Sequence, residues 1–155
     1  MGNYNFTKDL KIAKVTEEEV ADILVKKYNA KISDFNDTNS HDITGTIGNK
    51  TFTFEVKEDF RCGDTGNIAV EYSCRGKPSG IETTKAQYYI YKVHLKDKQV
   101  YVISSVDKLR KAIADNQYFR VVNGGDYKSN SLCYLFKYKN FINTGRVFHT
   151  EPLKE

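Results

Sequence analysis

The stretch HDITGTIGNKTFTFEVKED, residues 41–59, is the part of the sequence that best predicts the fold. Polar and apolar side chains alternate from Thr51 to Lys57, which is the pattern of a half-buried strand. Residues 42–47 predict a second strand, and Gly48-Asn49 between the two predicts a hairpin turn. The stretch therefore predicts a β-hairpin in which the start of the first strand lies beside the end of the second.

Three charged side chains of this hairpin are candidates for catalysis. Glu55 and Lys57 lie two residues apart on one strand, so they share a face. Asp42 opens the neighbouring strand, from which its carboxylate can reach the same point. Two carboxylates are suitable ligands for Mg²⁺, and a bound metal lowers the pKa of its water. A nearby lysine can orient that water or stabilise the transition state of a phosphoryl group. The simpler alternative is a surface ion pair between Glu55 and Lys57.

A helix is predicted upstream of the hairpin. Thr16 and Glu19 have the spacing of a capping box, which places the start of the helix at about residue 17 and leaves residues 1–14 as a short arm. Glu17 projects near the apolar stripe of this helix, where it either stabilises the helix dipole or is directed at the candidate site. The stripe consists of Val20, Ile23, Leu24 and Tyr28.

The remaining residues alternate predicted strands with a second helix. Residues 106–115 predict that helix, capped by Ser104 or Ser105. Residues 84–93 predict either a helix or a strand, because they are rich in aromatic and β-branched residues. Strands are predicted at 30–35, 68–73, 99–103, 118–122 and 131–138. This order predicts one mixed α/β or α+β domain over residues 1–155, built around a central sheet.

Composition restricts the class of protein only broadly. The net charge of +4 is compatible with a polyanionic partner but does not establish one. Cys62, Cys74 and Cys133 are widely spaced, so neither a zinc site nor a disulfide framework is expected. We expect reduced thiols and a cytoplasmic location, with no signal peptide and no membrane-spanning segment.

The acid followed by E-x-K resembles the PD-(D/E)XK nuclease superfamily. His41-Asp42 stands where that pattern has PD, and Glu55-Val56-Lys57 is the E-x-K. Residues 17–20 resemble the E-x-E-L run in the first helix of Holliday junction resolvases, with Glu17 in the active-site position. The resemblance implies a restriction-endonuclease-like core, a central mixed sheet flanked by helices, and metal bound by Asp42, Glu55 and Glu17.

A second resemblance lies downstream, in residues 65–91. This segment is similar to one that follows the E-x-K strand in phage and bacterial nucleases of the same superfamily. Gln87 and Tyr91 match the Q-x-x-x-Y pattern of RecB-like and phage exonucleases. The basic loop 75–80 and its neighbourhood offer candidate contacts to phosphate, which are Arg75, Lys77, Ser79, Lys85 and Gln87. The simpler alternative is a basic surface turn with solvated side chains.

These observations predict an Mg²⁺-dependent deoxyribonuclease, with Mn²⁺ as a substitute metal. An endonuclease is favoured over an exonuclease, a homodimer is compatible with a junction resolvase, and the downstream segment points to a phage or mobile element. The first alternative is a DNA-binding accessory protein on the same fold, with weak cleavage or none. The second is an unrelated α+β domain with a chance E-x-K, in which Asp42 and Glu55 would lie far apart.

Overall fold

The computed structural model describes residues 6–35, 42–123 and 130–149. The helices are α1 (Phe6–Tyr28), α2 (Cys62–Thr65), α3 (Val106–Ala114) and α4 (Tyr138–Phe141), with short 3₁₀ turns η1 (Gly80–Glu82) and η2 (Ile142–Thr144). The strands are β1 (Lys31–Phe35), β2 (Ile43–Ile47), β3 (Lys50–Asp59), β4 (Asn67–Cys74), β5 (Lys77–Pro78), β6 (Tyr88–His94), β7 (Gln99–Ser105), β8 (Arg120–Asn123), β9 (Ser131–Lys137) and β10 (Gly145–His149).

The described strands form two sheets. The larger has the order β1-β2-β3-β6-β7-β10, and the smaller has the order β5-β4-β9-β8. In the larger sheet β3 and β6 are parallel, and every other neighbouring pair is antiparallel. Parallel neighbours require a crossover connection, and here the crossover includes α2, β4, β5 and η1. The predicted mixed α/β class with a central mixed sheet is confirmed.

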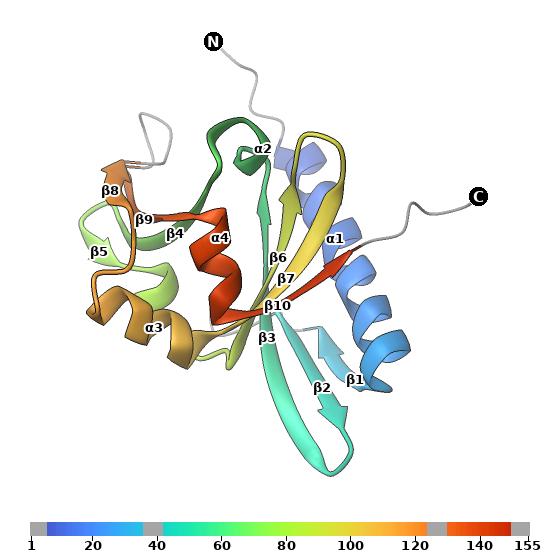
Figure 1. The fold of residues 1–155 in the computed structure, drawn as a ribbon. Coiled ribbons are helices and arrows are strands. Elements are labelled where there is room, and N and C mark those ends of the chain that lie inside the picture. The colour runs from blue at the N-terminus through green and yellow to red at the C-terminus, as the bar shows by residue number, and fades with distance from the viewer. Residues whose placement is uncertain (1–5, 36–41, 124–129, 150–155) are drawn as a thin grey trace.

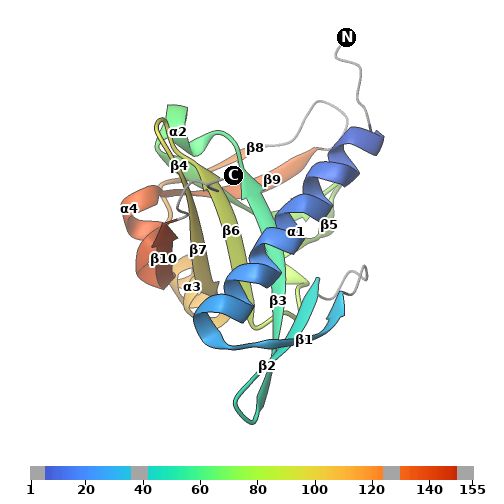
Figure 2. The same cartoon turned by 90° about the vertical axis from the view of Figure 1, so that its right-hand side faces the viewer.

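Each face of the larger sheet packs against a different layer. Helix α1 runs along one face, whereas the smaller sheet, α3 and α4 lie on the other (Figures 1 and 2). Strand β6 contributes to both cores because successive side chains of a strand point to opposite faces. Ile90 packs toward α1, while Tyr89 and Tyr91 pack toward the smaller sheet. Burial on both faces explains why residues 88–93 show no clear period in the sequence.

Helix α1 is longer than the sequence predicts. It begins at Phe6, so the arm expected over residues 1–14 is wrong for residues 6–14. Thr16 does not cap a helix, because it lies within α1 and its hydroxyl donates to Glu58 Oε1 on β3 at 2.6 Å. The predicted buried stripe is confirmed at Val20 and Leu24, which are 0% and 1% exposed.

The other differences between the predicted and the observed elements lie mainly in the middle and near the end of the chain. Residues 84–93 do not form a helix, since residues 88–94 are strand β6. Ser105 is the cap of α3, with its hydroxyl oxygen accepting a hydrogen bond from the Lys108 amide. Helix α4 and strand β10 were not expected from the sequence pattern. None of the described helices is long and apolar enough to cross a membrane.

A polar cluster joins α1 to the sheet beneath it. Lys92, which is 8% exposed, donates to Glu19 at 2.9 Å, and the Tyr101 hydroxyl donates to the same carboxylate oxygen. Burial acts to raise the pKa of Glu19, but the hydrogen bonds from Tyr101 and Lys92 outweigh it and leave that pKa below its ordinary value. Glu19 therefore helps to hold α1 against the sheet.

Candidate metal and active site

The carboxylate of Asp42 lies where the β2–β3 ladder ends. The last paired residues are Ile43 and Phe54, and the Asp42 amide donates to the Phe54 carbonyl at 2.9 Å. Beyond this point β3 continues, and the Val56 amide donates to Asp42 Oδ2 at 2.8 Å. The side chain of Asp42 thus satisfies a strand amide, which places its carboxylate beside Glu55. Asp42 and Glu55 therefore do not lie far apart, contrary to what a chance E-x-K was expected to give.

Glu55 and Lys57 point to the face of the sheet opposite α1. Lys57 Nζ lies 3.8 Å from Glu55 Oε2 and 5.9 Å from the centre of the Tyr89 ring. The side chain of Glu55 is only 13% exposed, against 40% for Lys57. A pair of solvated surface charges therefore does not describe this contact, since one partner is largely buried.

Burial of Glu55 leaves its charge poorly compensated. Oε2 is inaccessible to solvent and accepts no hydrogen bond from any residue that the structure describes. Burial raises the pKa of Glu55 and the nearby Asp42 carboxylate adds to the rise, while the ammonium of Lys57 and the nearby hydroxyls of Tyr89 and Thr84 oppose it without cancelling it. A buried acceptor without a partner is costly in a folded protein, so this oxygen is suited to an additional cation.

Mg²⁺ fits the donor set at this place. It is held by one or two protein carboxylates and keeps several waters, and Asp42 and Glu55 supply two neighbouring carboxylates. The described parts of the chain contain no group of three or more His, Cys, Asp or Glu side chains arranged to hold a metal. Two carboxylates match the few protein ligands that Mg²⁺ takes, whereas zinc takes three or four.

Tyr89 borders the same site and was not expected there from the sequence. Its side chain is 1% exposed, and its hydroxyl has no hydrogen-bond partner among the described residues. Burial raises the pKa of Tyr89 well above its ordinary value, and the charge of Glu55 adds to the rise. Tyr91 is also buried, on the same face of β6, whereas Tyr88 is half-buried. The parallel register that pairs Tyr89 with Glu55 has no signal in the sequence.

The structure places Glu17 in a neighbouring groove. Glu17 and Thr16 of α1 line it together with Val56, Lys57 and Glu58 of β3, and the groove has a volume of about 220 Å³. Glu17 thus approaches β3 from the side of α1, whereas Glu55 faces the other way. His41, which occupies the PD position beside Asp42, lies outside the described residues.

The predicted phosphate contacts lie in the crossover between β4 and β6. Arg75, Lys77 and Lys85 are exposed. The Ser79 hydroxyl donates to Glu71 Oε2 at 3.0 Å, and Gln87 Oε1 accepts a hydrogen bond from the Thr53 amide at 3.0 Å. Ser79 and Gln87 therefore stabilise the crossover, while the three cations extend into solvent.

The chain matches no protein-family model and none of the curated proteins compared with it. Its fold and site define a mixed α/β protein with two neighbouring carboxylates and a lysine on and beside β3, an inner strand of the central sheet. A more specific assignment depends on the chemistry that this site supports.

Proposed function

We propose that this protein is an Mg²⁺-dependent deoxyribonuclease with its catalytic centre at Asp42, Glu55 and Lys57. The observation that carries the proposal is the buried Oε2 of Glu55, which lacks a hydrogen bond from the described residues and lies near a second carboxylate. The Lys57 ammonium, 3.8 Å from that oxygen, compensates the two carboxylates only in part, so a bound metal ion would make the arrangement more favourable.

Each residue has a distinct role in phosphodiester hydrolysis. Asp42 and Glu55 would hold the metal, which supplies a water of lowered pKa and offsets charge on the phosphate. Asp42 is fixed for this role by its bond to the Val56 amide. Lys57, at 3.8 Å from Glu55, is close enough to stabilise negative charge on the phosphate oxygens as water adds to phosphorus and the P–O bond breaks.

DNA is the proposed substrate because of charge and resemblance together. The chain carries a net charge of +4, and the exposed Arg75, Lys77 and Lys85 are available for phosphate contacts. The acid and E-x-K pattern resembles nucleases that act on DNA. On the same resemblance, the protein is proposed as an endonuclease of a phage or mobile element acting in the cytoplasm as a monomer or homodimer. Glu17, expected from the sequence as a third metal ligand, is left out of the proposed site because it lies on the α1 side of β3.

The test compares cleavage of plasmid, linear duplex, single-stranded DNA and a four-way junction in Mg²⁺, Mn²⁺ and EDTA. Asp42→Asn and Lys57→Ala are the test variants, because asparagine keeps the acceptor for the Val56 amide and removes the charge. Asp97→Ala and Lys98→Ala are matched controls in the exposed turn between β6 and β7. We expect metal-dependent cleavage that falls about a hundredfold or more in the test variants and is unchanged in the controls.

Two results would contradict the proposal. Equal cleavage by the wild type, Asp42→Asn and Lys57→Ala would show that the activity comes from elsewhere. Binding of DNA by the wild type with no cleavage in either metal would favour the non-catalytic DNA-binding protein.

A further inference from the structure

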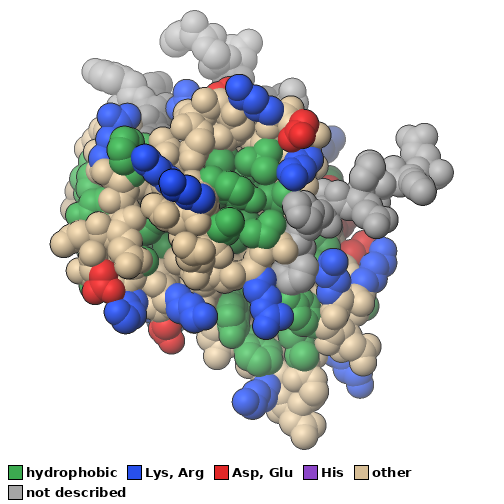
Figure 3. Space-filling model, viewed as in Figure 1, with side chains coloured by type: hydrophobic (Ala, Val, Ile, Leu, Met, Phe, Trp, Pro, Cys, Tyr) green, Lys and Arg blue, Asp and Glu red, His purple; other side chains and the backbone are tan. Residues whose placement is uncertain are grey.

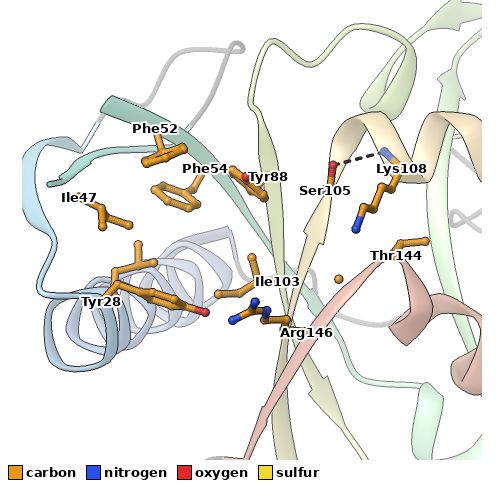
Figure 4. Close-up of a pocket in the computed structure, with 12 residues that line it drawn as sticks. Tyr28, Ile47, Phe52, Phe54, Tyr88, Ile103, Ser105, Lys108, Thr144 and Arg146 are labelled. Carbon is orange, nitrogen blue, oxygen red and sulfur yellow. Dashed lines mark hydrogen bonds between the residues drawn. The ribbon is translucent and has the colours of Figure 1, made fainter. Parts of the chain in front are cut away.

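A second feature of the molecule is an open groove at the end of the larger sheet where β6 begins. It lies between the C-terminal part of α1, the β2–β3 hairpin, the start of α3 and the start of β10, and its volume is about 520 Å³ (Figure 4). This volume is in the range of ligand-binding pockets.

Aromatic side chains form one wall of the groove. Phe52 and Tyr88 meet edge to face with their ring centres 5.9 Å apart, and Phe54 stacks on Tyr88 at 5.8 Å. Phe54 is buried, whereas Phe52 and Tyr88 are only half-buried. The wall therefore presents aromatic surface that the described part of the protein leaves partly uncovered.

Two cations from different elements reach into the same groove. Lys108 extends from α3 and Arg146 from β10, on the side of the groove away from the aromatic wall (Figure 4). Neither forms an ion pair with a carboxylate of the described residues. Figure 3 shows apolar surface above the β2–β3 hairpin with Lys and Arg side chains at its border. Arg146 contacts the Tyr28 side chain, which lines the same groove. The groove thus combines aromatic surface with two cations that no described carboxylate pairs with.

The groove lies on the face of the sheet opposite the candidate catalytic centre, at the same strand positions. In the parallel β3–β6 ladder, Phe54 pairs with Tyr88 and the next pair is Glu55 with Tyr89. The side chains of the first pair point to the face covered by α1, and those of the second pair point to the other face. The groove and the candidate centre are therefore separated by the thickness of the sheet. The exposed Gln87 comes immediately before Tyr88, and the exposed Lys85 lies two residues further upstream.

We propose that this groove binds unpaired nucleotides of the DNA substrate, which rests on the proposed nuclease function. Bases stack on Tyr88 and Phe52, and Lys108 and Arg146 contact the adjoining phosphates. Stacking on aromatic side chains together with cations along the backbone is the general mode of binding single strands. A continuous duplex cannot place a base on this wall without unstacking it, so the preferred substrate contains a single-stranded segment.

The test measures binding of a fluorescently labelled single-stranded oligonucleotide and of the matching duplex, in EDTA to prevent cleavage. Phe52→Leu and Tyr88→Leu remove aromatic faces and keep apolar volume. Each is expected to weaken binding to the single strand roughly tenfold, with a smaller effect on the duplex. Thermal unfolding of each variant shows whether it remains folded.

The charge contribution is tested by the double variant Lys108→Ala/Arg146→Ala. If each side chain contacts one phosphate, the slope of log affinity against log salt for the single strand falls by about 1.4. The matched control is Arg61→Ala/Lys98→Ala, which also removes one arginine and one lysine, but near the opposite end of β6. We expect this control to change the slope less. A slope that falls equally in both double variants would overturn the assignment of the groove.

Two further results decide between occupants of the groove. Wild-type affinity in folded aromatic and charge variants overturns the proposal. If those variants also lose self-association that the wild type shows, the groove binds a second copy of the chain instead. The nuclease proposal can fail while the groove proposal holds. In that case the groove variants lose binding to the single strand, but the wild type cleaves no DNA in Mg²⁺ or Mn²⁺.

Discussion

The carboxylate of Glu55 is buried, has a raised pKa and carries an oxygen without a hydrogen bond from the described residues. A carboxyl with a higher pKa in the folded protein binds more protons when folded. Its contribution to stability is therefore fully present below the unfolded pKa, near 4.5, and is lost as the pH rises through the folded pKa. At neutral pH the charged Glu55 should destabilise the protein in the absence of metal.

Glu55→Gln should separate stability from activity. We expect the metal-free variant to be more stable than the wild type at pH 7, by on the order of 1 kcal/mol, because the charge that opposes burial is absent. The gain should disappear below about pH 4.5, where the wild-type carboxyl is protonated. Urea unfolding in EDTA at several pH values measures this, and cleavage in Mg²⁺ should be abolished.

Glu58→Gln on the same strand is the control for this variant. Glu58 accepts from Thr16 and contacts His94 at 2.6 Å, so its substitution should destabilise the protein. A loss of stability in Glu55→Gln at pH 7 would show that Glu55 is held by favourable contacts, and a structural role would then replace the catalytic one.

At the scale of elements, the crossover from β3 to β6 depends on a close approach between η1 and β4. A Cβ atom at Gly80 would lie 2.2 Å from the Glu71 carbonyl oxygen, and its φ of 53° also favours glycine. Ser79, immediately before, donates to the Glu71 side chain. The end of the crossover is thus held against β4 by both backbone and side-chain contacts.

Gly80→Ala should therefore destabilise the protein much more than Gly76→Ala. Gly76 has a φ of 77°, but a Cβ atom added there would meet no atom within 4 Å, so alanine adds only backbone strain of about 1 kcal/mol. At Gly80 the strain and the collision act together, and we expect a loss of several kcal/mol. Chemical unfolding of both variants measures the difference, and equal losses would show that the approach of η1 to β4 relaxes easily.

At the scale of the whole molecule, two hydrophobic cores share the strands of one sheet. Val20 and Leu24 belong to the core under α1, whereas Cys62 and Phe136 belong to the core between the sheets. Strands β6 and β7 supply residues to both. Because one core cannot lose these strands without exposing the other, we expect the chain to unfold as a single cooperative unit.

Two probes test this cooperativity in one urea titration. The helical circular dichroism signal reports mainly on α1, which has 23 residues, and labelling of the Cys62 thiol reports on the core between the sheets. Burial raises the pKa of this thiol to about 11, so it should react only after unfolding. Peptide mass spectrometry distinguishes the labelling of Cys62 from that of the other two cysteines. Coincident midpoints of the two signals would support one cooperative domain. Separated midpoints would show two independent units.

Features that depend on neighbouring residues could be predicted from the sequence. The alternation of residues 51–57, the turn at Gly48-Asn49 and the cap at Ser105 follow from local side-chain chemistry and agree with the structure. The same alternation placed Glu55 and Lys57 on one face. The hairpin pairing placed Asp42 beside them, because the short turn sets the register and thereby brings the two distant strand ends together.

Features that depend on contacts between distant segments were decided by the tertiary structure. The capping-box pattern at Thr16 was misleading because its hydroxyl bonds to Glu58, 42 residues away. Strand β6 was ambiguous because it is buried on both faces, and Tyr89 joins the site only through the parallel pairing of β3 with β6. The local sequence pattern was sufficient to identify which carboxylates and which lysine lie together. Tertiary packing decided that Glu55 is removed from solvent, because burial comes from the layers that close over the sheet.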